Sequence, residues 1–188
     1  MKDGLVVFDA PISEAYSRWV IDAAKAKYPD KAIKYLVLTH HHLDHVNGVR
    51  TYVAEGVTVI VPTPDKAYFE QVVKAAHTVA PDALQKQMRP VNIVEVKQEM
   101  SLKDDTTEIR LYNIPNPHVE GMIIGHVVKD NIVWVTDIWS PGRDVARTPG
   151  TLALNDAVKS FGIKDATFAG GHGSTAKQSV LDGIVARD

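Results

Sequence analysis

Thr39-His40-His41-His42-Leu43-Asp44-His45 is the stretch of this sequence that says most about its fold. It follows residues 33–38, a mostly apolar run that predicts a buried β-strand. Residues just beyond the carboxyl end of such a strand reach the crevice where α/β proteins bind ligands. His40 and His42 are two residues apart, so in extended backbone their side chains share one side, whereas Asp44 and His45 follow once the chain has begun to turn. One short loop could therefore serve two neighbouring metal ions.

The residue types in this stretch also indicate which metals to expect. Four of the eight histidines of the chain fall within residues 40–45. Imidazole and carboxylate together suit zinc, and also iron or manganese. The alternative is a polar, solvated loop whose histidines cap the next helix. The strand that precedes the loop and the helix expected after it favour the metal site.

Composition excludes several classes of protein. The chain has 188 residues, of which 45% are hydrophobic, and this predicts one globular domain over residues 1–188. The net charge is −2 with no block of like charges, so we expect no nucleic-acid partner. No apolar run reaches the length of a membrane span, so we expect no membrane partner. The absence of cysteine excludes disulfides, thiolate ligands and a cysteine nucleophile.

Short apolar runs alternate with amphipathic segments along the chain. We expect strands at residues 5–8, 33–38, 57–61, 91–96, 108–114, 121–128, 132–136 and 166–169. We expect helices at residues 13–27, 46–55, 63–77, 151–161, and from about 176 towards the end. In the first helix, Tyr16, Trp19, Val20 and Ala23 lie at helical spacing and are expected to face the core. Alternating strands and helices followed by a hairpin predict a layered α/β domain with a mixed sheet.

The histidine-rich stretch resembles the signature of the metallo-β-lactamase fold superfamily, which has His-x-His-x-Asp-His after an apolar strand. Four further family motifs occur in the expected order along the chain. They are an early strand ending in Asp9, a loop containing His118, a hairpin followed by Asp137, and a short strand followed by His172. The resemblance covers residues 5 to 175. It implies an α/β (α+β) fold, an αββα sandwich with a dinuclear metal site at one edge.

The resemblance also implies which residues bind metal. The implied ligands are His40, His42 and His118 for one ion, Asp44, His45 and His172 for the second, and Asp137 as a bridge between the two. Asp9 would orient the histidine-rich loop by hydrogen bonds without binding metal itself. Two zinc ions are expected, with iron or manganese as alternatives.

Such a site predicts metal-assisted hydrolysis of a small-molecule substrate by a metal-bound hydroxide. No protein nucleophile is required, which agrees with the absence of cysteine and of a Gly-x-Ser-x-Gly elbow. Asp44 is the candidate catalytic residue that orients the hydroxide and carries a proton.

The substrate class follows from finer features of the resemblance. The aspartate at position 137 resembles the glyoxalase II, lactonase and phosphodiesterase branches, which also have aspartate there. This resemblance favours an ester, thioester or lactone as the substrate. The familiar dizinc β-lactamases place cysteine there, so a β-lactam ranks low. The segments around His118 and Asp137 look most like quinoprotein-associated metallo-hydrolases. The alternatives are a mononuclear iron dioxygenase acting on a thiol persulfide and a metal-bound, non-catalytic domain.

The start of the chain departs from the family pattern. The family usually has two or more strands before the aspartate that Asp9 matches, whereas the first strand here begins at residue 5. We therefore expect the outermost N-terminal strands to be missing, because the chain is a fragment of a longer protein. A natural minimal version, or a homo-oligomer that covers the open edge, are the alternatives. Localisation is left open: the chain as written carries no signal peptide, and one upstream would direct the protein to the periplasm.

Three histidines lie outside the ligand set, and Trp134 and Trp139 flank Asp137 in the sequence. His41 alternates away from its neighbours and is expected to pack or face solvent. His77 is expected to be exposed late in a helix, and His126 to make a structural hydrogen bond. For Trp139 two roles are open, lining a substrate pocket and packing in the core. Trp134 is expected in the core.

Overall fold

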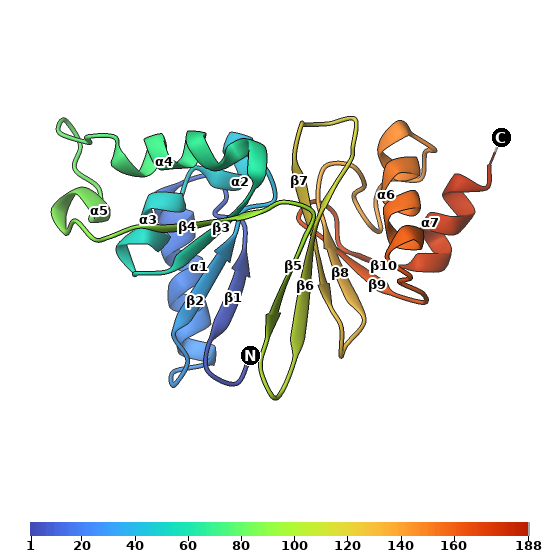
Figure 1. The fold of residues 1–188 in the computed structure, drawn as a ribbon, viewed down its shortest axis with the longest axis horizontal. Coiled ribbons are helices and arrows are strands. Elements are labelled where there is room, and N and C mark those ends of the chain that lie inside the picture. The colour runs from blue at the N-terminus through green and yellow to red at the C-terminus, as the bar shows by residue number, and fades with distance from the viewer. Residues whose placement is uncertain (188) are drawn as a thin grey trace. The chain divides into compact units, whose positions relative to one another are not determined.

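The computed structural model describes residues 1–187, and its tertiary contacts divide the chain into two compact units, Met1–Val96 and Lys97–Asp188. Each unit has its own β-sheet (Figure 1). Each unit also has its own hydrophobic core. Among the described residues, no helix is both long enough and apolar enough to cross a membrane.

The first unit is built on a four-stranded parallel sheet with the order β1-β2-β3-β4. Its strands are β1 (Leu5–Phe8), β2 (Ile33–Val37), β3 (Thr58–Pro62) and β4 (Asn92–Val96). Its helices are α1 (Glu14–Lys27), α2 (Leu43–Val46), α3 (Val49–Ala54), the 3-10 turn η1 (Thr63–Asp65), α4 (Lys66–Lys74) and α5 (Ala83–Lys86). Because the strands are parallel, the loops after β1, β2 and β3 all leave the same edge of the sheet.

The core of the first unit joins the sheet to its helices. Leu36 and Val59 from the strands pack with Ile21 of α1, Tyr52 of α3 and Phe69 of α4 in one cluster of buried side chains. Ser13 caps α1, accepting a hydrogen bond from the Tyr16 backbone N–H at 3.2 Å.

A buried arginine fixes the segment between α4 and α5. Arg50 is 6% exposed and donates to the backbone carbonyls of Val72, Val73 and Ala75 at the end of α4. The same guanidinium donates to both carboxylate oxygens of Asp82. These bonds give partners to carbonyl groups in the last turn of the helix, where backbone donors run out.

The second unit has a six-stranded mixed sheet with the order β10-β9-β8-β7-β6-β5. Its strands are β5 (Glu99–Lys103), β6 (Glu108–Ile114), β7 (Met122–Val127), β8 (Ile132–Val135), β9 (Thr167–Gly170) and β10 (Thr175–Lys177). The pairing of β8 with β9 is parallel and the other pairings are antiparallel. Helices α6 (Pro149–Ser160) and α7 (Gln178–Val185) bury Leu154 and Leu181 against the core of this sheet.

Several predicted elements are wrong in detail. The helix expected over residues 46–55 is two short helices, α2 and α3, separated at Asn47 and Gly48. The helix expected to reach residue 77 ends at Lys74. Strands β5 and β10 were not predicted from the sequence.

The buried face of α1 also differs from the prediction. Its buried residues are Ser17 and Ile21, whereas Trp19 is 63% exposed. The buried face of α1 is the one where Ser17 packs closely against Gly48, just before α3. A Cβ added to Gly48 would lie 1.8 Å from the Ser17 hydroxyl oxygen. A tryptophan does not fit where two backbones approach so closely.

Trp139 tests the hydrophobic core of the second unit, and Trp19 serves as its exposed control. Trp139 is fully buried with its ring 5.2 Å from that of Phe168. We expect Trp139→Ala to lower the free energy of unfolding by about 3–5 kcal/mol, because it leaves a cavity. Trp19→Ala, at an exposed position, should change it by less than about 0.5 kcal/mol. Urea unfolding followed by circular dichroism measures both, and equal effects would contradict this description of the core.

The Arg50–Asp82 pair gives a test that depends on pH. The hydrogen bond from Arg50 lowers the pKa of Asp82 below its ordinary value, although burial opposes the shift. A carboxyl group with a lowered pKa adds stability above its unfolded pKa of about 3.9 and loses it as the pH falls through the folded value. Asp82→Asn should therefore cost about 1–3 kcal/mol at pH 7, and the difference from the unmutated chain should shrink below pH 4. A difference that is the same at pH 7 and at pH 3 in urea unfolding would contradict the assignment.

Candidate metal centre

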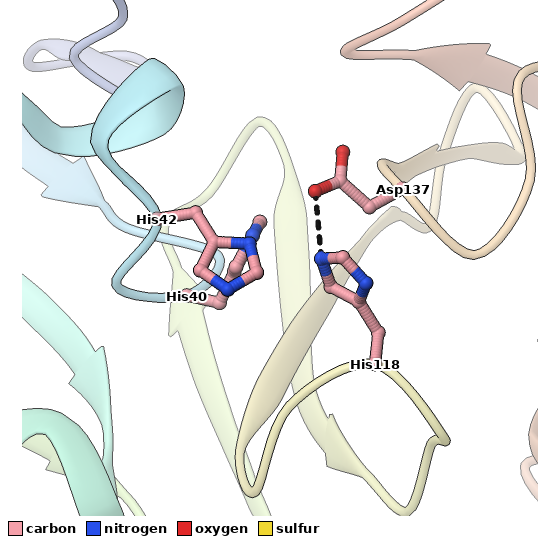
Figure 2. A group of neighbouring side chains, drawn as sticks. All are labelled: His40, His42, His118 and Asp137. Carbon is pink, nitrogen blue, oxygen red and sulfur yellow. Dashed lines mark ion pairs between the residues drawn. The ribbon is translucent and has the colours of Figure 1, made fainter.

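The first cluster of candidate ligands is defined as His40, His42, Asp44 and His45, in the loop and short helix that follow β2. The ring of His40 lies 4.6 Å from the ring of His42 and 4.6 Å from that of His45, centroid to centroid. Figure 2 shows the imidazoles of His40 and His42 beside each other on this loop. His40 and His45 are buried, while His42 is half-buried and Asp44 is exposed. The structure therefore brings the ligands predicted in this loop together.

The carboxylate of Asp9 holds this loop from the end of β1. Oδ1 of Asp9 accepts from the backbone N–H of Thr39 at 2.8 Å and from its hydroxyl at 2.9 Å. Oδ2 of Asp9 lies 2.9 Å from Nδ1 of His45. Asp9 has a left-handed backbone with φ of 61°, a conformation that aspartate tolerates better than most residues. The sequence-based expectation that Asp9 orients the loop by hydrogen bonds is confirmed.

These bonds determine which ring nitrogens are left for a ligand. When Nδ1 of His45 bonds Asp9, its Nε2 remains, and this atom lies 3.4 Å from Oδ2 of Asp44. The Thr39 hydroxyl lies 3.1 Å from Nδ1 of His40, so the same logic assigns Nε2 of His40 to a ligand. A carboxylate that fixes the outward nitrogen of an imidazole is the usual support of a metal-binding histidine.

Burial and the nearby carboxylate of Asp9 also act on one tyrosine, Tyr52. Burial, together with the negative charge of Asp9, raises the pKa of Tyr52 to about 12. Tyr52 is therefore protonated at neutral pH and does not serve as a base here.

The second cluster of candidate ligands is defined as His118, Asp137 and His172, in three loops of the second unit. Oδ2 of Asp137 lies 2.9 Å from Nε2 of His118, and this pair is drawn in Figure 2. Oδ1 of the same carboxylate lies 3.1 Å from Nε2 of His172. Each oxygen of Asp137 thus faces a different imidazole, which is the arrangement that a bridging carboxylate needs.

Local backbone structure places His118 and Asp137. Asn116 Oδ1 accepts from the backbone N–H groups of His118 and Val119, both at 2.9 Å, and so forms the turn that presents His118. Asp137 is in the left-handed region with φ of 59°, and the Thr136 hydroxyl donates to its Oδ1 at 2.8 Å. Strained non-glycine residues of this kind cluster at functional sites.

Glycines make room for His172. A Cβ on Gly171 would lie 2.8 Å from the Thr136 hydroxyl oxygen, so a side chain there would press on the strand end that carries Asp137. Gly173 has a left-handed backbone with φ of 85°, and a Cβ on it would lie 2.5 Å from the Pro141 carbonyl oxygen. The glycines on both sides of His172 are thus required by close packing, against the Thr136 side chain at Gly171 and against backbone at Gly173.

The donor atoms in both clusters suit a divalent metal. Each of the seven predicted ligands belongs to a group of histidine and aspartate side chains that could hold a metal ion. Imidazole nitrogen and carboxylate oxygen are the donors of zinc, iron and manganese sites, and hydrogen-bonded partners orient several of them here. The residues therefore fit a metal, while the identity of the metal remains a prediction.

The histidines outside the predicted ligand set have other partners. Nε2 of His126 lies 3.0 Å from Oδ1 of Asn131, which confirms its structural hydrogen bond. His77 lies beyond α4 rather than on it, with Nδ1 3.1 Å from a carboxylate oxygen of Asp82. His41 is half-exposed, and its Nδ1 lies 2.9 Å from Oδ1 of Asp65, a contact that strand alternation did not predict.

The burial of Trp139 and Trp134 shows which of them lies in the core. Trp139 is fully buried and its indole N–H donates to the Asp144 carbonyl at 3.3 Å, so it belongs to the core rather than lining a pocket. Trp134 is only half-buried on β8, contrary to the expectation that it lies in the core.

Sequence reasoning missed three residues that contact a predicted ligand, Thr39, Asn116 and Thr136, and it missed Asp65, which contacts His41. Thr39 and Thr136 each directly precede a predicted ligand, and Asn116 lies in a Pro-Asn-Pro turn, so these positions carried a weak local signal. Asp65 carried none, because it is 24 residues from His41 and their contact depends on the pairing of strands.

Comparison with known proteins identifies the family. The model of the metallo-beta-lactamase superfamily matches residues 2–182. The chain belongs to this superfamily. Its members are mostly metal-dependent hydrolases, and the αββα sandwich expected from the sequence is their fold.

Solved structures of superfamily members have the same fold. A metallo-beta-lactamase from Pontibacter korlensis has a TM-score of 0.74, is 14% identical, and is matched over 99% of this chain and 82% of its own. The metallo-beta-lactamase FIM-1 from Pseudomonas aeruginosa, in a mono-zinc form, has a TM-score of 0.68, is 15% identical, and is matched over 98% of this chain and 78% of its own. An archaeal superfamily protein from Sulfolobus tokodaii has a TM-score of 0.64 at 15% identity, over 98% of this chain and 75% of its own.

Two curated relatives match a shorter stretch. A linear primary-alkylsulfatase from Pseudomonas sp. (strain ATCC 19151) is 45% identical over 53 residues, which are 28% of this chain and 10% of the sulfatase. A second linear primary-alkylsulfatase from Pseudomonas sp. is 37% identical over 54 residues, 29% of this chain and 8% of that protein. The match thus spans about a tenth of the length of these relatives.

The support that Asp9 gives to the loop leads to a prediction. Asp9→Asn replaces one acceptor oxygen by an N–H donor, so the side chain can no longer accept from both Thr39 and His45. We expect zinc affinity to fall by about 10–100-fold, measured by competition with a chromophoric chelator. Asp22→Asn, on the exposed surface of α1, is the control and should bind zinc as the unmutated chain does. Equal affinities for both variants would contradict the role of Asp9.

Proposed function

We propose that the chain is a dinuclear metal-dependent hydrolase. The observation that carries this proposal is the Asp137 carboxylate, whose two oxygens lie 2.9 and 3.1 Å from the Nε2 atoms of His118 and His172. A carboxylate with one oxygen for each of two imidazoles suits a bridge between two ions, each bound by one of those imidazoles.

The ligand sets implied by the family resemblance agree with the chemistry of each cluster. One ion would be held by His40, His42 and His118. The other would be held by Asp44, His45 and His172, and Asp137 would serve both. In support, His40 and His45 have their Nδ1 atoms bonded to Thr39 and Asp9, which leaves Nε2 of each ring for the metal.

Divalent ions held by these residues would lower the pKa of a water molecule and polarise the carbonyl or phosphoryl group of the substrate. The residues of the chain then hold and orient the reactants. Asp44 is the candidate for orienting the attacking water and for accepting its proton, because its side chain is 55% exposed while its Oδ2 lies 3.4 Å from Nε2 of His45. A carboxylate that combines access to solvent with contact to a ligand can move a proton between the site and bulk water.

For the substrate we propose an ester, thioester or lactone. The donor set of histidine and aspartate, with Asp137 rather than cysteine at the bridging position, supports this class over β-lactams. A sulfate ester is the second candidate, and the observation that favours it is the 45% identity to a linear primary-alkylsulfatase over 53 residues.

A panel of substrates tests the reaction class. Zinc-loaded protein is assayed on p-nitrophenyl acetate, a thioester, a lactone, a phosphodiester, a β-lactam and a primary alkyl sulfate, each with and without chelator. We expect two zinc ions per chain by elemental analysis and chelator-sensitive turnover of one of the ester classes. One iron ion per chain with oxygen consumption on a persulfide would instead establish a dioxygenase. Bound metal without any turnover would establish a non-catalytic domain.

Substitutions test the residues. His42→Ala and Asp44→Asn should each lower turnover by about 10²–10⁴-fold, because the first removes a ligand and the second removes the proton acceptor. Both variants should remain folded by circular dichroism. His77→Ala is the control with unchanged turnover, since His77 lies on the segment between α4 and α5. Undiminished turnover in Asp44→Asn would remove Asp44 from the mechanism.

A further inference from the structure

The loop that carries His40 and His42 is flanked by aspartates from both neighbouring strands. The sheet order places β2 between β1 and β3, and all three strands run parallel. Asp9 directly follows β1, and Asp65 ends the η1 turn that follows β3. The loop after β2 therefore leaves the sheet between two carboxylates at the same edge.

Asp9 and Asp65 contact different parts of this loop. Asp9 bonds its two ends, at Thr39 and at His45. Asp65 bonds its middle, through Oδ1 at 2.9 Å from Nδ1 of His41. His41 lies between two predicted ligands and is not itself one of them.

We propose that His41 is a positioning residue that, through its hydrogen bond to Asp65, fixes His40 and His42 in the orientation required to bind the same metal ion. This inference rests on the proposed function, because it assigns His40 and His42 to one ion.

The position of Asp65 supports a dedicated contact. Asp65 is 5% exposed and occupies the N-cap of α4, where an aspartate ordinarily accepts from the backbone N–H groups of the first turn. Its side chain makes no such capping bond. The carboxylate instead points to His41, and burying a carboxylate is costly unless a donor compensates it. A buried carboxylate thus holds the ring of a residue in the ligand loop.

The ring of His41 acts on its neighbours in two ways. Its centroid lies 5.2 Å from that of His42 in an edge-to-face arrangement, so it limits the rotation of the His42 ring. Its side chain also ties down the backbone between His40 and His42, whose rings are 4.6 Å apart. A ligand pair held in place before the metal arrives loses less conformational entropy on binding, and its affinity is therefore higher.

The chain contains a matched control for this pair. His77 and Asp82 form a second contact between a half-exposed histidine and a largely buried aspartate, with Nδ1 3.1 Å from Oδ2. The side chains of His41 and His77 are 42% and 41% exposed, so the two pairs are nearly equal in environment. Only the first pair lies in the ligand loop.

The variants are His41→Ala, His41→Asn and His77→Ala, each made in the full chain. Asparagine carries an N–H donor at the same number of bonds from the backbone as Nδ1 of histidine, so it can restore the bond to Asp65. Zinc affinity is measured by competition with a chromophoric chelator, and ligand geometry by the visible spectrum of the cobalt-loaded protein. Amide hydrogen exchange over residues 39–45 of metal-free protein reports on the loop itself.

We expect His41→Ala to weaken binding of one of the two zinc ions by about 10–100-fold, to alter the cobalt spectrum and to speed exchange in the loop. His41→Asn should recover most of the affinity, and His77→Ala should match the unmutated chain. If the unmutated chain binds two zinc ions and His41→Ala binds them equally well, the positioning role is wrong while the proposed function stands. If His41→Asn is as weak as His41→Ala, the hydrogen bond is not the cause and the inference is overturned. An unmutated chain that binds no metal overturns the proposed function itself.

Discussion

The buried carboxylate of Asp9 is the contact on which the ligand loop depends. It accepts from the backbone and the hydroxyl of Thr39 and bonds His45, so one charged group connects the end of β1 to both ends of the loop after β2. A charge with 4% exposure is tolerated because donors surround it. The bond to Nδ1 of His45 also holds the ring of this predicted ligand. Stability of the loop and orientation of the ligands therefore have one physical origin.

Parallel pairing of the strands makes this contact possible. In a parallel sheet the carboxyl ends of neighbouring strands meet at one edge, so residues that are 30 and 24 apart in the sequence, Asp9 with Thr39 and His41 with Asp65, become hydrogen-bond partners. A loop held at its ends by one strand neighbour and in its middle by the other has little freedom. This is the pre-organisation that a metal centre requires of ligands drawn from a loop.

The second unit reaches a similar result by a different route. Asp137 holds a left-handed backbone, glycines on both sides of His172 admit close backbone contacts, and Asn116 shapes the turn at His118. Left-handed backbone at an aspartate costs free energy, which the surrounding sheet and core offset. The candidate ligands of this superfamily member thus lie both at a sheet edge and on strained loops.

The sequence by itself determined most of the elements, the family and the candidate ligands, because strand periodicity and the spacing of His40, His42, Asp44 and His45 are local properties. It also identified Asp9, since an early strand ending in aspartate is part of the family pattern. It misplaced the buried face of α1, because the close approach of Gly48 to Ser17 is set by packing and not by helical spacing. The partnership of His41 with Asp65, and the division of the Asp137 oxygens between two imidazoles, were decided by the tertiary structure alone. Such contacts depend on which strands lie side by side and on how loops turn, and neither is encoded in a short stretch of residues.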